Sequence, residues 1–123
     1  MATQENITSI SIPSSGDLSS DQFKLVIINS DGEVALAGLN EIAAGVLQGK
    51  PSVQGEAAEV AILGAPKVIA GATITAGDQI TSTAVGLADK AVSTDVVVGT
   101  ALENAVINDV FRILFHSAGA LLA

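Results

Sequence analysis

The sequence has no cysteine, no tryptophan and no tyrosine, and only one histidine and three phenylalanines among its 123 residues. Without cysteine there is no disulfide framework, no thiolate nucleophile and no metal site of the thiolate kind. The missing Trp and Tyr are the side chains that most often stack on sugars and bases and anchor protein contacts. Carbohydrate binding and single-strand binding are therefore disfavoured.

Basic residues are also scarce. Five Lys and Arg stand against thirteen Asp and Glu, which gives a net charge of −8 and the wrong sign for binding phosphate backbones. No apolar run approaches the roughly 18 residues of a membrane-spanning helix, and the first residues lack the pattern of a signal peptide. We expect no nucleic-acid partner, no membrane partner and a protein that stays where it is made, in the cytoplasm.

The apolar residues that are present are mostly small. They make up 49% of the chain, but 20 of them are Ala, so Val, Ile and Leu must build the core. A chain of this length forms about one domain and buries only some two thirds of its unfolded surface. A core this thin favours association with other copies of the chain.

Short apolar runs separated by turn residues predict β-strands. The clearest pair is a β-hairpin, in which runs 23–28 and 33–37 flank Asp31 and Gly32. Segment 38–49 is ambiguous, because Asn40 could cap a short helix, but Gly45 in its middle would cost about 1 kcal/mol, so a strand or irregular structure is favoured. Further extended segments are expected at 57–63, from 67 to 69, at 95–102 and at 111–115, with short pieces within 70–82 and on either side of Gly86.

Turn signals recur about every eight to twelve residues, which is typical of a sandwich or small barrel. We therefore predict an all-β fold: a small single-domain β-barrel or β-sandwich of short strands with an extended N-terminal arm. The predicted divisions are the arm at 1–20, the β domain at 21–116 and an apolar C-terminal tail at 117–123. Segments 44–48 and 98–102 also resemble each other, which suggests a duplication, although the spacing to the following strand differs.

Residues suited to catalysis are few. His116 follows the last apolar strand, and no G-x-S-x-G sequence supports a nucleophile near it. The carboxylates are scattered, and the Gly-rich segment 70–78 has neither phosphate-binding motif. Asp31 and Asp78 lie beside turn glycines, where their carboxylates are expected to accept local backbone hydrogen bonds. We predict no enzyme activity, no catalytic residue, no cofactor and no metal.

Both ends of the chain carry apolar residues that a solvated tail seldom has. Isoleucines alternate with hydroxyl residues near the start, and the final segment is small and apolar without charge. These side chains are candidate contacts with a partner or another subunit: Ile7, Ile10, Ile12, Leu121 and Leu122.

The order of several Gly-containing segments resembles the small capsid cement, or head decoration, proteins of tailed bacteriophages. The matching segments, which together span about residues 20–115, are 45–48, 55–57, 67–71, 74–78, 84–86 and 98–103. The resemblance implies turn or close-packing roles for Gly45, Gly71, Gly77, Gly86 and Gly99, beside the turn residues Gly32 and Asp78.

The resemblance also implies a function. Such a protein is a structural virion protein on the outer capsid surface, where it binds neighbouring major capsid proteins and stabilises the shell, often as a homotrimer. Two other classes stay open from the residues: a trimeric head fibre or host-surface adhesion module, and an accessory domain of a larger complex. Binding to isolated capsids would favour the capsid-stabilising protein, and binding to host-surface ligands would favour the adhesion module.

Overall fold

The computed structural model describes residues 5–39, 41–92 and 95–121, and these residues form ten strands and no helix. The prediction of an all-β fold is confirmed. The strands are β1 (Glu5–Pro13), β2 (Leu25–Ile28), β3 (Val34–Leu36), β4 (Gly45–Leu47), β5 (Ala57–Ala65), β6 (Lys67–Ile69), β7 (Gln79–Ser82), β8 (Ala88–Lys90), β9 (Val96–Ala101) and β10 (Val110–Leu121).

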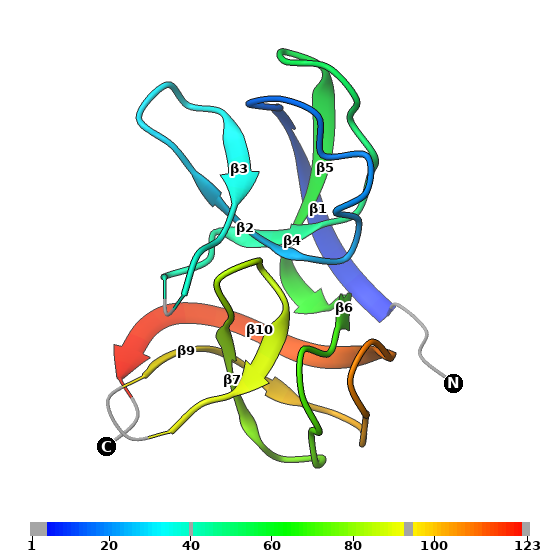
Figure 1. Cartoon of the computed structure of the whole chain (residues 1–123), viewed down its shortest axis with the longest axis vertical. Helices are drawn as coiled ribbons and strands as arrows, with labels where there is room; N and C mark the ends of the chain where they lie inside the picture. Colours follow the sequence, from blue (N-terminus) through cyan, green and yellow to red (C-terminus); the bar gives the residue numbers. More distant parts are fainter. Residues whose placement is uncertain (1–4, 40, 93–94, 122–123) are drawn as a thin grey trace.

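The strands form one curled sheet in which every strand pairing is antiparallel. The order is β3-β2-β4-β5-β10-β9-β7-β8, with β1 added beside β5 and β6 beside β10. Figure 1 shows β1 to β5 in the upper part of the molecule and β6 to β10 in the lower part. The two parts meet where the end of β5 runs along β10, since Gly64 pairs with Phe115.

The two parts have the same strand pairing, so the fold is an internal repeat. In the first unit (β1–β5), β1 pairs with β5, β2 with β3, β2 with β4 and β4 with β5. In the second unit (β6–β10), the corresponding strands pair in the same four ways. Even the isolated parallel bridges correspond, because Ser14 meets Val34 and Ala70 meets Ala88. The suggested duplication is thus present in the strand arrangement.

The register gives a residue-by-residue correspondence. Val26 pairs with Gly45 in the first unit and Ile80 with Gly99 in the second, so equivalent residues differ by 54 in number. In the last strands, Leu47 pairs with Val60 and Ala101 with Ile113, where the later residues differ by 53. The turn before β10 is therefore one residue shorter than the turn before β5, which explains the unequal spacing in the sequence.

The cores of the units also correspond. A cluster in the first unit contains eight residues, and each of them has its equivalent in the larger cluster that spans the second unit. The equivalent pairs are Ile12 and Val68, Leu18 and Ile74, Val26 and Ile80, Val34 and Ala88, Leu47 and Ala101, Ala58 and Phe111, Val60 and Ile113, and Ile62 and Phe115. Most of the other residues of the larger cluster lie between the units.

The hairpin β7–β8 holds the second unit against the first. The carbonyl of Gly86 in its turn accepts a 2.8 Å hydrogen bond from the Leu25 N–H. Leu25 and its strand partner Val46 are fully buried there, whereas their equivalents Gln79 and Thr100 are polar and half-buried. A third unit stacked on the second would therefore meet a polar surface. Terminal units of repeat proteins typically have such a polar outer face.

The structure clarifies three segments that the sequence left open. Residues 5–13 are extended as expected for the arm, but they form β1 and pair along β5 as part of the sheet. The ambiguous segment 38–49 contains the strand β4 and no helix among its described residues. Residues 117–121 of the expected tail lie in β10, which pairs with β9 at Leu121 and Val96.

Asn108 provides a test of the repeat. Its φ is 73°, and that of the equivalent residue Gly55 is 86°. The Asn108 N–H donates a 2.8 Å hydrogen bond to the Ala70 carbonyl, and the Gly55 N–H donates one of the same length to the Ser14 carbonyl. Asparagine tolerates this left-handed conformation better than alanine does, so Asn108→Ala should lower the free energy of unfolding by about 1 kcal/mol, whereas Asn108→Gly should not lower it. Urea unfolding measures both, and equal losses would contradict the assignment.

Candidate functional site

No group of three or more His, Cys, Asp or Glu side chains among the described residues could hold a metal ion. The side chain of His116 lies outside the described part of the structure. In that part, too, no helix is long and apolar enough to cross a membrane.

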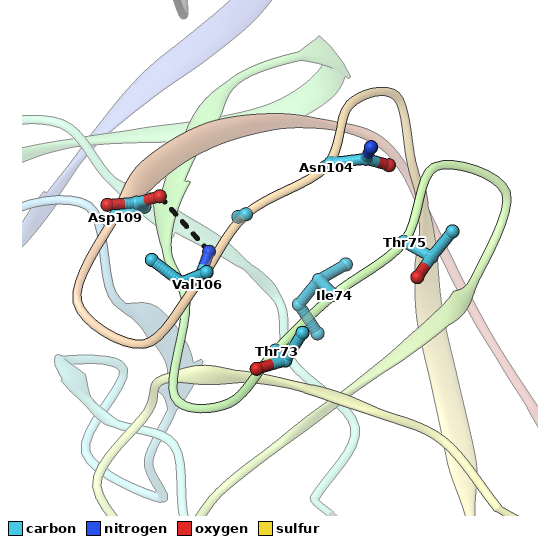
Figure 2. Close-up of a pocket in the computed structure, with 7 residues that line it drawn as sticks. Thr73, Ile74, Thr75, Asn104, Val106 and Asp109 are labelled. Atoms are coloured by element: carbon cyan, nitrogen blue, oxygen red, sulfur yellow. Dashed lines mark hydrogen bonds between the residues drawn. The ribbon is translucent and has the colours of Figure 1, made fainter.

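A shallow depression of about 290 Å³ lies where the loop after β6 meets the turn before β10. Figure 2 shows its lining residues, which are Thr73, Ile74, Thr75, Asn104, Ala105, Val106 and Asp109. Its polar groups stabilise the turns: Asp109 Oδ2 accepts from the Val106 N–H at 3.0 Å, and Asn104 Oδ1 from the Ala76 N–H at 2.8 Å. This arrangement is structural, with no activated nucleophile or base.

Carboxylates elsewhere also accept backbone hydrogen bonds in turns. Asp78 Oδ2 accepts from the Thr75 N–H at 2.9 Å, as expected for a turn residue, and Asp78 Oδ1 lies 3.9 Å from Lys90 Nζ. Asp31 instead donates its own N–H to Asn29 Oδ1. In the first unit, Glu56 Oε1 accepts from the Ser52 N–H at 2.7 Å.

The Ser52 hydrogen bond makes stability depend on pH. The backbone N–H of Ser52 lowers the pKa of Glu56 below its ordinary value of 4.5. A lowered folded-state pKa stabilises the fold above the unfolded pKa, and this contribution is lost as the pH falls through the folded pKa. Glu56→Gln should therefore weaken the decline in stability below about pH 4.5, measured by thermal unfolding at several pH values. An unchanged pH profile would contradict the prediction.

The glycines singled out in the sequence have two kinds of environment. Gly32, Gly77 and Gly86 have φ values of 75°, 92° and 77°, which favour glycine. At Gly45 and Gly99 the neighbouring strand leaves no room for a Cβ, which would lie 2.5 Å from the Ala61 carbonyl oxygen or 2.7 Å from that of Leu114. A Cβ on Gly71 would lie 2.9 Å from the Cβ of Leu87.

The candidate contact residues near the chain ends differ in accessibility. Ile10 is 44% exposed, Ile7 is half-buried, and Ile12 packs against the core of the first unit. The backbone of Leu121 pairs with Val96, and Leu122 lies outside the described residues. Of the three isoleucines, Ile10 thus has the side chain that is most accessible to a partner.

The sheet places an apolar surface around β10 that sequence patterning missed. Val110, Arg112 and Leu114 alternate with buried residues of β10 and point outward. Strand partners share a face, which brings Lys67 and Ile69 of β6 beside Arg112 and Val110. We define the β10 face as Leu63, Lys67, Ile69, Leu102, Val110, Arg112 and Leu114. Its apolar members Leu63, Leu102, Val110 and Leu114 are 57%, 40%, 41% and 47% exposed.

Two cations lie next to each other on this face. Lys67 and Arg112 are direct strand partners, and like charges in that position repel. Glu103 offsets part of this repulsion, because its Oε2 lies 3.5 Å from Arg112 Nε and accepts the Arg112 backbone N–H at 2.9 Å. The Lys67 ammonium lies 5.8 Å from the centre of the Phe23 ring, within range of a cation–π contact.

Comparisons with known proteins give a structural likeness only. No family model matches the chain, and no curated protein sequence matches it. The chain is similar to the crystal structure of the head fiber gp8.5 N base in bacteriophage phi29, with a TM-score of 0.70 and 23% sequence identity. The likeness covers 93% of this chain and 98% of that chain. The two proteins therefore share a fold over nearly their whole lengths.

Proposed function

We propose that the protein is a structural virion protein of a tailed bacteriophage, located on the outer capsid surface. There it binds neighbouring major capsid proteins and stabilises the shell as a homotrimer. The observation that carries the proposal is the nearly complete fold likeness to the base of a phage head fiber. The Gly-containing segments that resemble capsid cement proteins support the same class, as does the exposed apolar surface around β10.

The physical basis of such a role is repetition. A small domain with a net charge of −8 and few aromatic residues has limited means of forming one strong contact. Many weak contacts repeated by symmetry over a shell can nevertheless give high occupancy.

Light scattering tests the proposal directly. The purified protein is measured alone, for its oligomeric state, and then with capsids that lack it. Saturable stoichiometric binding that raises the temperature of capsid rupture would support the cement role. A monomer that leaves capsids unchanged would contradict both the trimer and the stabilising role.

A head fibre or host-surface adhesion module is the second candidate, because the structure to which the fold is similar is the base of a phage head fiber. Such a protein would attach to the capsid without raising its rupture temperature, and it would bind host cells or their surface glycans. Capsid rupture and host-cell binding by the same preparation therefore separate the two roles.

The exposed edge of β1 offers one test of the contact residues predicted from the sequence. An edge strand can receive a strand from a partner through main-chain hydrogen bonds, and Ile10 is accessible there. Ile10→Lys should lower capsid occupancy, because a lysine on an edge strand opposes such pairing. Ile12→Val, which stays apolar at the neighbouring core position, is the control. Occupancy equal to that of the natural chain in both variants would argue against this contact.

A further inference from the structure

We propose that the β10 face is a docking surface for a protein surface that is apolar and bears carboxylates. This inference rests on the proposed function, in which the partner is the major capsid protein. The observations that support it are the internal repeat, the paired cations and the conformation of Phe23.

The internal repeat shows that the fold does not require the apolar residues of this face. Val110 has Ala57 as its equivalent in the first unit, Leu102 has Gln48, and Ile69 has Pro13. Both units form the same strand pairs, although the first has small or polar residues at these positions. The larger apolar side chains are thus additional to what folding needs, and the exposed Leu102 and Val110 form a contact patch beside Arg112 and Lys67.

The charges on the β10 face also differ from those at the equivalent positions of the first unit, and the second unit is the more positive. Arg112 stands where the first unit has Glu59, and Lys67 stands where it has Ser11. The chain has five basic residues and a net charge of −8, and two of these basic residues lie next to each other on this face. Carboxylates on a partner would relieve the repulsion between the two cations and orient the approach of an otherwise acidic protein.

Phe23 adds an aromatic group beside the cations at a conformational cost. Its φ is 69°, and its N–H donates to the Leu47 carbonyl at 2.7 Å. Gly77 occupies the equivalent position, with a φ of 92° and the same hydrogen bond to Ala101. A bulky residue in this conformation is strained, and strain of this kind is concentrated at functional sites. The ring lies under Lys67 and extends the patch.

These charges disfavour contact between the β10 faces of two copies. If two copies met through the same face about a two-fold axis, Lys67 and Arg112 of one would approach Lys67 and Arg112 of the other. An apolar surface with carboxylates has the opposite charge and the same apolar character. Arginine is also among the residue types enriched at contacts that dominate binding.

The repeat supplies substitutions that the fold already accommodates. Leu102→Gln, Val110→Ala and Arg112→Glu each replace a residue of the second unit with the residue found at the equivalent position of the first unit. Phe23→Gly replaces a residue of the first unit with the residue found at the equivalent position of the second unit. Val85→Asp is the matched control, because Val85 is 49% exposed in the turn between β7 and β8, outside the face, and Asp31 is its equivalent. Circular dichroism and thermal unfolding establish that each variant is folded.

Binding is measured by co-sedimentation with empty shells of the major capsid protein encoded in the same genome. We expect each face variant to bind about tenfold more weakly or worse, the control to bind like the natural chain, and the natural affinity to fall with added NaCl. Folded face variants that bind normally would overturn the inference while leaving the proposed function intact.

Two other outcomes are also decisive. If the natural chain does not bind the shells, the proposed function fails, and the capsid-protein partner inferred here fails with it. Sedimentation velocity of the free protein is the separate readout for self-association. The face variants could lower the oligomeric state of the free protein and still bind shells like the natural chain, when the binding is compared at equal oligomeric state. The occupant of the face would then be a second copy, and the inference would be wrong.

Discussion

Replacing Gly45 by alanine is expected to lower the free energy of unfolding by about 3 kcal/mol, because the new methyl group has no space. It would lie 2.5 Å from both the carbonyl oxygen of Ala61 and Cγ1 of Val60. Gly45 is fully buried in β4, between β2 and β5, so neither neighbouring strand can move without loss of sheet hydrogen bonds. Urea unfolding followed by circular dichroism measures the loss.

The repeat predicts the same behaviour at Gly99. A methyl group there would lie 2.7 Å from the Leu114 carbonyl oxygen and 3.1 Å from Cδ1 of Ile113. Gly16→Ala is the control, since nothing lies within 4 Å of its added Cβ, and the stability should stay the same or rise. A Gly45→Ala protein as stable as the Gly16→Ala protein would show that the strand spacing differs from the one described.

Truncating Phe111 to alanine is expected to cost about 4 kcal/mol of unfolding free energy, a value typical of a buried phenylalanine. Phe111 is 1% exposed and is the largest fully buried side chain of the described residues. Its equivalent in the first unit is Ala58, where larger neighbours fill the space: Val34 and Leu47 stand where the second unit has Ala88 and Ala101. The Phe111→Ala cavity therefore lacks neighbours large enough to fill it.

This exchange of volumes leads to a rescue experiment. Adding Ala101→Leu to Phe111→Ala reproduces the first-unit pair Leu47 and Ala58, and it should recover part of the lost stability. Ala101→Leu alone should destabilise, because Phe111 already occupies the space. Thermal unfolding of the single and double variants gives the coupling between the two positions. Additive losses would contradict the proposed equivalence of the two cores.

Much of the local structure follows from the sequence because its causes are local. The hairpin around Asp31 and Gly32 depends on a positive φ in the turn and on alternation in the flanking strands. Gly45 argued correctly against a helix, since the segment around it forms β4. The all-β class itself followed from short apolar runs between turn residues.

The β10 face could be predicted only in part. The alternation of Phe111, Ile113 and Phe115 with Arg112 in the sequence is typical of a strand with one buried side, and the structure buries the three apolar residues. It did not show that Lys67 would stand beside Arg112, because that depends on the pairing of β6 with β10. The apolar surface missed from the sequence consists of residues from β5, β6 and β10 and of Leu102, which follows β9, and no single sequence window contains them all.

The sequence by itself determined the strand class, the turns, the scarcity of catalytic groups and the acidic charge, because these depend on residue type and near neighbours. Only the tertiary structure decided that β1 belongs to the sheet, that two units repeat the same pairing, and which exposed residues share a surface. The physical reason is that strand pairing is set by contacts distant along the chain. The cores of the two units have large and small residues at different equivalent positions. The units can therefore keep the same strand pairing although their sequences show little likeness.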